Sequence, residues 1–508
     1  MRDRPHILIA MVDQLSALYL RAYGYPVTKT PTIDRLAESG VVFEHMYTPS
    51  PLCAPARASF MTGLLPTRTG VYDNSAELAS SIPTFAHYLR LEGYRTCLSG
   101  KMHFVGADQL HGFEERLTTD VYPGDFGWTP DWSRPGERVD WWYHNMTSVK
   151  EAGVAEITNQ LEYDDEVAFH AVRRVYDYAR YEGDQPLALC VSFSSPHDPY
   201  VARQRYWDLY ADDEIDLPAT PALAPEQLDP HSRRLWNDCL IGEAGVTEDD
   251  VRASRHGYFA NLSYVDEKIG EVLATFAACG LKDDTIVVLT SDHGDLLGEL
   301  GLFYKMSFRE HAARVPLIVH APGRFPARRV REPASLIDLL PTLADLARPG
   351  LSDELARPVD GRSLAPLLEG ADEEADASVV GEYLAESILG PMVMLRRGRW
   401  KLIHTASDPD QLFDLEEDPL ERVNLSDSAE HASLVRELRA EVASRWDLDE
   451  VDRSVRKSQQ ARLAVFRALQ EGTRFPWDFQ PSRPASQQYT RNTMDVAARD
   501  QKSRFPPL

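Results

Sequence analysis

Short apolar segments rich in β-branched residues alternate with amphipathic segments through the first two-thirds of this 508-residue chain. Strands separated by helices favour a mainly parallel sheet that is covered by helices on both faces. We predict strands at 6–12, 41–47, 94–98, 187–193, 285–290 and 315–320, and helices at 31–39, 84–92, 164–181, 249–278 and 336–346. The predicted fold class is therefore α/β, with a large, mainly parallel (mixed) sheet sandwiched between helices.

The pattern changes near residue 350. An acidic stretch at 369–376 precedes short predicted strands at 393–396 and 400–404 and a helix near 429–446, which is typical of a smaller α+β domain. From Arg474 onward, Pro, Gln, Arg and aromatic residues occur without periodicity, as in an arm that is disordered or docked on another surface. We predict a catalytic domain at 1–350, an α+β domain at 351–455 and a C-terminal arm at 456–508 that docks on a neighbouring subunit.

Composition and charge argue against several classes of protein. Lys and Arg total 54 and Asp and Glu total 79, a formal net charge of -25, so nucleic acids and anionic membranes are poor partners. The apolar stretch at 7–12 is too short for a membrane span and lacks a cleavage-site pattern. Five scattered cysteines without C-x-x-C spacing argue against a disulfide framework and a structural zinc site. We predict a cytoplasmic enzyme with no nucleic-acid or membrane partner.

Polar residues directly follow four of the predicted strands. They are Asp13-Gln14, Lys101 to His103, His197-Asp198 and Asp292-His293. Because ligands of open α/β sheets bind outside the carboxyl ends of the strands, we expect these segments to converge at one edge. Asp13, Gln14, Asp292 and His293 would then bind a divalent cation. Oxygen donors favour Ca²⁺ or Mg²⁺, whereas a histidine admits Mn²⁺ or Zn²⁺. Taken alone, Asp292-His293-Gly294 is equally compatible with turn chemistry.

One segment combines a nucleophile precursor with a fixed cation. It reads Cys-Ala-Pro-Ala-Arg from Cys53 to Arg57 and continues to Thr62-Gly63. Residues i and i+4 share one face of a helix, and the first helical turn presents unpaired N–H groups, so Arg57 would meet the anion that Cys53 attacks. This pattern favours a hydrolase of anionic esters. The alternative is a buried cysteine that merely begins a helix.

The same segment resembles the Cys-x-Pro-x-Arg signature of the type I sulfatases, in the alkaline phosphatase superfamily. In that family the cysteine is oxidised to formylglycine, whose hydrate carries two hydroxyls on one carbon. One hydroxyl attacks sulfur and the second expels sulfate by elimination. The resemblance implies a formylglycine at Cys53 that is also a metal ligand. Many sulfatases carry Asn where this chain has His293, which leaves the identity of the metal open, with Ca²⁺ favoured over Mg²⁺ and Mn²⁺.

The resemblance also implies roles for four further side chains. Lys101 and Lys305 would neutralise the nonbridging sulfate oxygens. His103 would act as general base on the second hydroxyl, and His197 would protonate the leaving oxygen, although the two histidines could exchange these roles. Asn74 would add a neutral donor near the sulfate. A single lysine or histidine, considered alone, is as compatible with a solvated or structural role.

Further segments look like those of the choline sulfatase branch of this family. They are 53–74, 97–106, 111–120, 140–145, 476–478 and 489–492. A quaternary ammonium group is held by aromatic faces and carboxylates, and the segment 126–142 contains four of the nine tryptophans. Any one of these tryptophans is equally compatible with core packing. The predicted substrate-binding residues are Asn74, Trp128, His144, Glu382 and Asp495.

We predict that the chain hydrolyses choline O-sulfate to choline and inorganic sulfate with one divalent metal and a formylglycine at position 53. Expected partners are a formylglycine-generating enzyme and further copies of the chain, in a dimer or tetramer with exchanged C-terminal arms. Two alternatives stay open. One is a phosphonate or phosphate mono- or diester hydrolase of the same superfamily. The other is a noncatalytic binding protein for a quaternary-ammonium osmolyte, against which the complete set of Cys53, Arg57, Asp13 and Asp292 argues.

Overall fold

The computed structural model describes residues 4–122, 124–138 and 144–471. Its largest element is a nine-stranded mixed sheet. The strands are β1 His6–Val12, β2 Val41–Tyr47, β3 Arg95–Gly100, β4 Glu115–Arg116, β6 Leu187–Phe193, β8 Thr285–Thr290, β9 Arg314–His320, β10 Arg328–Val330 and β11 Ala334–Ser335. Their order is β10-β2-β9-β8-β1-β6-β3-β4, with β11 paired to β2. This sheet confirms the predicted fold class.

Four neighbouring strands at the centre of the sheet, β8, β1, β6 and β3, run parallel to one another. Their carboxyl ends therefore lie at one edge of the sheet, as the sequence predicts. The sheet is mixed because β9 runs antiparallel to both β8 and β2. Strand β3 ends at Gly100 rather than at the predicted Leu98, because Ser99 and Gly100 continue the pairing with β6.

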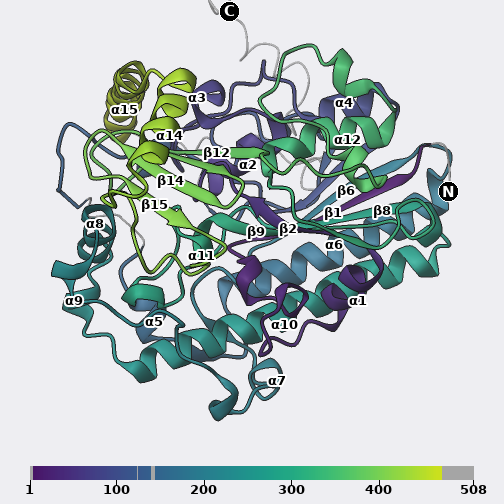
Figure 1. Ribbon diagram of the computed structural model, residues 1–508. Coiled ribbons are helices and arrows are strands. Elements are labelled where there is room, and N and C mark those ends of the chain that lie inside the picture. The colour runs from purple at the N-terminus through teal and green to yellow at the C-terminus, as the bar shows by residue number, and fades with distance from the viewer. Residues whose placement is uncertain (1–3, 123, 139–143, 472–508) are drawn as a thin grey trace, which may run out of the picture.

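Helices cover both faces of the sheet (Figure 1). On one face lie α1 Pro31–Ser39, α6 Asn159–Tyr181 and α10 Glu248–Ala278, and on the other lie α2 Cys53–Thr62, α4 Phe85–Leu91 and α12 Leu339–Ala347. Alternate residues of a strand point to opposite faces. Accordingly, Ile7, Ile9 and Met11 of β1 pack in the core beneath α2, α4 and α12, whereas Leu8 and Val12 pack beneath α1, α6 and α10.

The predicted helices are present, with altered ends. Helix α6 begins at Asn159, five residues before the predicted start, because the Thr158 side chain caps it by accepting from the Leu161 N–H. The segment predicted to begin a helix at 336 starts with a 3₁₀ turn, Leu336–Asp338, before α12. The shorter elements are α3 Pro66–Thr69, α5 Thr147–Lys150, α7 Gln204–Trp207, α8 Pro230–Asp238, α9 Ile241–Ala244, α11 Glu310–Ala313, α13 Ala365–Leu368, β5 Gly153–Val154 and β7 Val201–Ala202.

A second, antiparallel sheet of four strands follows the large one along the chain. It contains β12 Ser378–Tyr383, β13 Met392–Arg397, β14 Trp400–Thr405 and β15 Gln411–Asp414, and it is followed by α14 Ala432–Arg445 and α15 Leu448–Gln470. Apolar side chains of α14 pack on β13 and β14. Helix α15 runs across the predicted boundary between 455 and 456, so at least its residues to 470 continue the folded body. The division into 1–350, 351–455 and 456–508 otherwise stays a prediction.

A buried ion cluster joins the second sheet to the first. Lys401 of β14 lies 2.7 Å from a carboxylate oxygen of Glu310 and 2.7 Å from one of Glu421. The Tyr47 hydroxyl of β2 also donates to Glu310, at 3.0 Å. Removing one member of such a cluster would leave an unpaired buried charge, which is strongly destabilising. The cluster therefore fixes α11, which follows the segment that carries Lys305.

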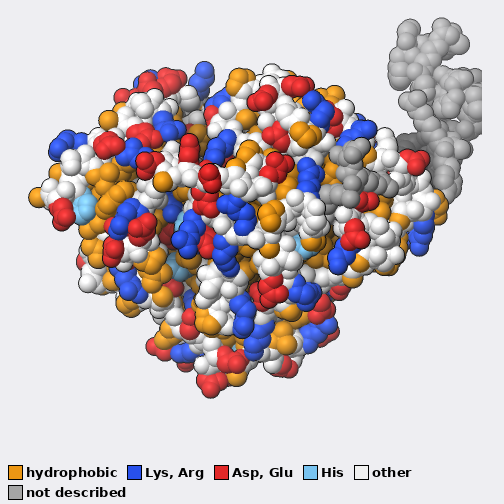
Figure 2. Space-filling view, turned by 45° about the vertical axis from the view of Figure 1, so that its right-hand side comes forward, with side chains coloured by type: hydrophobic (Ala, Val, Ile, Leu, Met, Phe, Trp, Pro, Cys, Tyr) orange, Lys and Arg blue, Asp and Glu red, His pale blue; other side chains and the backbone are white. Residues whose placement is uncertain are grey.

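The surface and the cysteines add three facts. Acidic and basic side chains are interspersed over the face shown in Figure 2, with small groups of apolar side chains between them. No helix within the described ranges is long and apolar enough to cross a membrane. All five cysteines of the chain lie within the described ranges, and all are free thiols.

Candidate active site

Helix α2 places Cys53 and Arg57 at its first and fifth positions, and both side chains are buried. The helix begins at Cys53 because Leu52 has an extended backbone, and the Ala54 N–H of the first turn donates to the Asn74 side-chain oxygen at 2.9 Å. The helix ends at Gly63, whose φ of 67° lies in the left-handed region that glycine tolerates. The predicted pairing of nucleophile precursor and cation on one helix face is thus present in the geometry.

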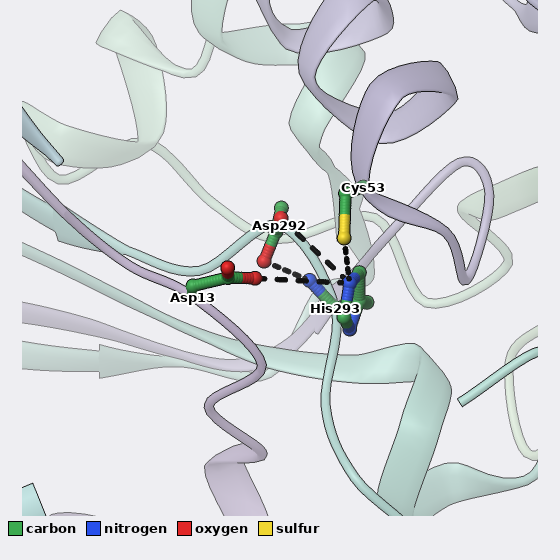
Figure 3. A group of neighbouring side chains, drawn as sticks. All are labelled: Asp13, Cys53, Asp292 and His293. Carbon is green, nitrogen blue, oxygen red and sulfur yellow. Dashed lines mark hydrogen bonds and ion pairs between the residues drawn. The ribbon is translucent and has the colours of Figure 1, made fainter. Parts of the chain in front are cut away.

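Four side chains converge at the carboxyl edge of the large sheet (Figure 3). Asp13 follows β1, Asp292 and His293 follow β8, and Cys53 begins α2. All four are buried, and one potential ligand atom from each lies within 4.8 Å of the others. The Cys53 sulfur is 3.1 Å from His293 Nε2, and the same nitrogen is 3.9 Å from Asp13 Oδ1 and 3.7 Å from Asp292 Oδ2.

Gln14 lies directly beside this cluster. Its backbone has a φ of 62°, and its N–H donates to Asp292 Oδ1 at 3.1 Å. Its side-chain Nε2 donates to Asp295 at 2.7 Å, and its Oε1 accepts from Lys305 Nζ at 2.6 Å. Asp295 takes the amide nitrogen and Lys305 uses one lone pair of the amide oxygen, so the second lone pair of that oxygen remains for a cation. Asp295 was not predicted from the sequence, although it lies only two residues after His293.

The chemistry of this donor set fits a divalent cation. Asp13 Oδ1 is buried and accepts no hydrogen bond from the described part of the chain. Burial and the nearby Asp292 carboxylate raise the pKa of Asp13, while Arg57, against the effect of burial, holds the pKa of Asp292 well below its ordinary value. Two carboxylates, an amide oxygen and an imidazole are suitable ligands for Ca²⁺, Mg²⁺ or Mn²⁺. A cation here would satisfy the orphaned oxygen.

Cations also surround the position of the nucleophile. Arg57 Nε donates to Asp292 at 2.8 Å, and Arg57 Nη1 donates to the Lys101 carbonyl at 2.7 Å. Lys101 Nζ donates to Asp13 and lies 3.4 Å from the Cys53 sulfur. Although burial opposes the thiolate, Lys101, Lys305 and His293 lower the pKa of Cys53 well below its ordinary value. The sulfur stands where a hydroxyl oxygen of a formylglycine hydrate would lie, so this environment would stabilise an oxyanion as well.

His103 follows β3, and the partly buried carboxylate of Asp120 fixes its backbone. The N–H groups of Met102 and His103 donate to Asp120 at 3.0 and 2.8 Å, and Arg116 donates to the same carboxylate at 2.8 Å. His103 itself has a φ of 58°. Its side chain adds to the groups that lower the pKa of Cys53. Asp120 thus determines where His103 stands, and sequence reasoning did not identify it.

His197 follows β6 and contacts the second lysine. Its Nε2 is 2.7 Å from Lys305 Nζ, and its Nδ1 is 2.8 Å from the Asp198 backbone oxygen and 3.1 Å from Asp198 Oδ1. The Tyr122 hydroxyl is 3.1 Å from the same Nδ1. The Asp198 carbonyl accepts a proton carried by Nδ1, which directs Nε2 toward Lys305. Neither Asp198 nor Tyr122 was predicted as a site residue.

Aromatic rings form one wall of the site. Trp128 ends a 3₁₀ turn, Phe126–Trp128, and its ring centroid is 6.0 Å from that of His103 and 5.8 Å from that of Tyr122. The Lys101 ammonium lies over the Tyr122 ring, 4.4 Å from the centroid. The predicted Trp128 is thus beside the catalytic cluster. The neighbouring Trp132 instead donates its indole N–H to the Ala385 carbonyl and is a packing residue, and Trp141 and Trp142 lie outside the described residues.

His144 lies beside His197 and Asp198 at the same site. It is buried, its Nε2 lies 4.0 Å from Asp198 Oδ1, and its ring centroid is 4.5 Å from that of Tyr304. Burial and the Lys305 charge lower the pKa of His144 well below its ordinary value. The imidazole is therefore neutral in this environment and can contact a cation without repelling it.

Glu382 does not reach the cluster, which corrects its prediction as a substrate-binding residue. Its carboxylate accepts from the Thr67 N–H at 2.7 Å, the Thr67 hydroxyl at 2.8 Å and the Trp446 indole at 2.6 Å. Burial raises its pKa to about 7. These three bonds occupy the carboxylate between α3 and α14. The other predicted carboxylate, Asp495, lies outside the described residues.

Glu386 lies four residues further along the chain and is within electrostatic range of the cluster. Burial and the Asp73 charge raise its pKa to about 7, and both Lys305 and Cys53 influence it electrostatically. It lines a cavity of about 670 Å³ that also borders Gly127 and Trp132. The sequence Gly-Glu-Tyr-Leu-Ala-Glu at 381–386 contains both glutamates, and nothing in it shows which of them faces the site.

Three family models match the chain. The sulfatase model matches residues 5–349, the model of the N-sulphoglucosamine sulphohydrolase C-terminal region matches 298–447, and the model of the choline sulfatase enzyme C terminus matches 453–505. The first covers more than half of the chain and includes the whole carboxyl-edge cluster. The chain belongs to the sulfatase family.

Individual relatives show where the chain is most similar within and around the sulfatase family. The chain is 51% identical to a choline-sulfatase of Rhizobium meliloti (strain 1021), over 99% of each chain. It is 28% identical to the multifunctional alkaline phosphatase superfamily protein PehA of Trinickia caryophylli, over 89% of this chain and 97% of the relative. A phosphonate monoester hydrolase from Silicibacter pomeroyi has a similar structure, with a TM-score of 0.71 at 23% identity over 87% of this chain and 95% of that chain. This last likeness shows the fold alone.

Proposed function

We propose that the chain hydrolyses choline O-sulfate to choline and inorganic sulfate. The observation that carries the reaction is the position of Cys53, which stands in a buried group of two carboxylates, two lysines, an arginine and a histidine. The full-length identity of 51% to the choline-sulfatase of Rhizobium meliloti supports the choice of ester.

The proposal includes two groups that belong to the sulfatase family. Asp13, Gln14, Asp292, His293 and the residue at position 53 would hold one divalent metal, for which Ca²⁺ is our choice and Mg²⁺ or Mn²⁺ the substitutes. Bound there, the metal would polarise the attacking hydroxyl and a sulfate oxygen. A formylglycine at position 53 would supply two hydroxyls on one carbon, so that sulfate leaves by elimination rather than by a second attack on sulfur.

The lysines and Asn74 would bind the sulfate end of the ester. Lys101 Nζ and Lys305 Nζ both face the nucleophile and both lower the pKa of Cys53, so each can pair with a nonbridging oxygen. Asn74 uses its side-chain oxygen to accept from Ala54, which leaves its amide nitrogen as a donor. Arg57, which already donates to Asp292, would offset the electrostatic repulsion between the two metal-binding carboxylates and the sulfate charge.

Two histidines would move the protons. A proton shared between Lys305 Nζ and His197 Nε2, 2.7 Å apart, can pass to the alcohol oxygen as the ester bond breaks. Asp198, 3.1 Å from Nδ1, stabilises the positive charge on this imidazole. His103 would take the proton of the second hydroxyl, because its side chain also interacts with the residue at position 53.

The cationic end of the ester would lie against the aromatic wall. Trp128 and Tyr122 offer ring faces, the neutral His144 adds a third ring, and the Glu386 carboxylate lies beside the same space. A quaternary ammonium cannot donate a conventional hydrogen bond, so rings and carboxylates are the groups that can recognise it.

A ranking of esters tests the proposed function. Choline O-sulfate should be hydrolysed with a kcat/KM at least about 100-fold above those of 4-nitrophenyl sulfate and phenylphosphonate, because loss of the cation contacts costs several kcal/mol. Steady-state kinetics on the metal-loaded enzyme measure all three. If phenylphosphonate ranks first, the related phosphonate hydrolase activity is the better assignment.

Trp128→Ala tests the aromatic wall. We expect KM for choline O-sulfate to rise about 10-fold with little change for 4-nitrophenyl sulfate, since one desolvated cation–π contact is worth roughly 1–2 kcal/mol. Trp132→Phe is the matched control, because the Trp132 indole is bonded to the Ala385 carbonyl. An equal rise in KM for both substrates in Trp128→Ala would indicate general damage to the structure rather than loss of a cation contact.

The proposal also covers partners and location. A homo-oligomer in which the arm at 456–508 docks on a neighbouring subunit, maturation by a formylglycine-generating enzyme and a cytoplasmic location remain predictions. The five free thiols support a reducing compartment.

A further inference from the structure

Helix α15 packs on the loops that carry two of the substrate-binding residues. These loops comprise residues 71–75 and 126–132. Gln459 Oε1 accepts from the Trp132 N–H at 2.9 Å, and a Cβ at Gly127 would lie only 3.4 Å from the Phe466 ring. The C-terminal half of α15 therefore lies directly over the loop that contains Trp128.

Arg462 of this helix donates hydrogen bonds to both loops. Its Nη1 and Nη2 donate to the two carboxylate oxygens of Asp73 at 2.6 and 2.7 Å, and Nη1 also donates to the Thr129 hydroxyl at 3.2 Å. Asp73 is fully buried and Arg462 is 6% exposed. A bidentate pair of this kind fixes orientation as well as distance.

The tied residues are immediate chain neighbours of the binding residues. Asp73 precedes Asn74, which bonds the first turn of α2 through Ala54, and Thr129 follows Trp128. Ser75 reinforces the link, because its hydroxyl accepts from the Trp128 N–H at 2.9 Å and donates to the Asp125 carbonyl at 2.9 Å. The position of Trp128 relative to the nucleophile thus depends on the Arg462 guanidinium together with the Ser75 hydroxyl.

We propose that Arg462 is a positioning residue for substrate recognition, which sets the gap between Asn74 at the sulfate end and Trp128 at the cationic end of the ester. This inference rests on the proposed function. Arg462 falls in the segment that the choline sulfatase C-terminal model matches, 453–505. Through Arg462, this segment would help to position the substrate-binding residues.

Charge and geometry contribute separately to this role. The Asp73 charge reaches Glu386 and helps to raise its pKa, so Arg462 neutralises an anion close to the site. A lysine at position 462 would keep this positive charge. It would lose the planar guanidinium group that bonds both carboxylate oxygens of Asp73 and the Thr129 hydroxyl. Arg462→Lys therefore separates geometry from charge. Thr129→Val removes the contact with Arg462, together with the 2.9 Å bond from the Thr129 hydroxyl to the Phe126 carbonyl, while Asp73 stays paired.

The test compares these two variants and Arg462→Ala in the full chain with Arg453→Ala, a control on the same helix whose exposed guanidinium bonds only Glu450 within the described part of the chain. We expect Arg462→Lys and Thr129→Val to raise KM for choline O-sulfate about 3- to 10-fold, to keep kcat within about twofold, and to spare 4-nitrophenyl sulfate. Arg462→Ala should show a larger rise in KM, and Arg453→Ala none.

Two outcomes would overturn the role of Arg462. One is an unchanged KM for choline O-sulfate in Arg462→Lys and Thr129→Val. The other is an equal rise in KM for choline O-sulfate and 4-nitrophenyl sulfate. If Arg462→Ala fails to fold, the other two variants decide. Failure of the proposed function is distinct, because it appears in the wild-type enzyme as a preference for another ester. The comparison then uses that ester against 4-nitrophenyl sulfate, and a selective rise in KM still supports the positioning role.

Discussion

Cys53→Ala should lower the turnover of choline O-sulfate by at least about 10⁴-fold, because no other side chain can form the covalent ester with sulfur. Alanine fits the buried site without adding volume, so the variant should fold normally. Steady-state release of sulfate measures the loss, and circular dichroism checks the fold. Cys279→Ala, at a partly exposed thiol, is the matched control and should retain wild-type turnover.

Mass spectrometry tests the modification at position 53 directly. Mass analysis of the peptide that contains residue 53 should find an aldehyde or its hydrate in active enzyme, and the fraction converted should scale with specific activity. Fully active enzyme that retains an unmodified thiol at this position would contradict the proposed nucleophile.

Asp292→Asn should lower both the metal content and the turnover, the latter by about 10³-fold, since loss of a charged ligand removes several kcal/mol of stabilisation. The neutral amide also deprives Arg57 of its 2.8 Å ion pair and leaves Asp13 as the only carboxylate in the cluster of Asp13, Cys53, residue 292 and His293. Elemental analysis gives the metal content per chain, independently of activity.

Asp283→Asn is the control for this variant, because Asp283 is exposed in the turn just before β8. It should retain one metal per chain and full turnover. Unchanged metal content in Asp292→Asn would show that the cluster of Asp13, Cys53, Asp292 and His293 is not the metal site, whatever happens to activity.

The fold was predictable because its signals are local. A fully buried strand such as β1 reads as a continuous apolar run, and Pro31 and Gly40 mark the two ends of α1. Helix α15 was missed because only Val455, Gln459 and Arg462 among its described residues are buried, so two of its three inward positions are polar.

The candidate site was predictable where residues stand at the ends of strands or in the Cys53 segment. Asp13, Lys101, His197 and Asp292 follow parallel strands, and this rule alone brings them together. Glu382 was misplaced because the loop after β12, rather than any motif, decides which glutamate faces the cavity. Tyr122 and Asp120 were missed because each acts from a loop without regular structure, through contacts with residues that are distant in the sequence.

The sequence alone determined the class of fold, the placement of Cys53 and Arg57 one helical turn apart, and the strand ends that carry Asp13 and Asp292, since each depends on residues close together in the chain. Only the tertiary structure decided the alcohol end of the pocket. There Glu386, Tyr122 and Arg462 come from segments up to several hundred residues apart, and packing of one loop on another, which no local pattern encodes, determines which side chains point inward.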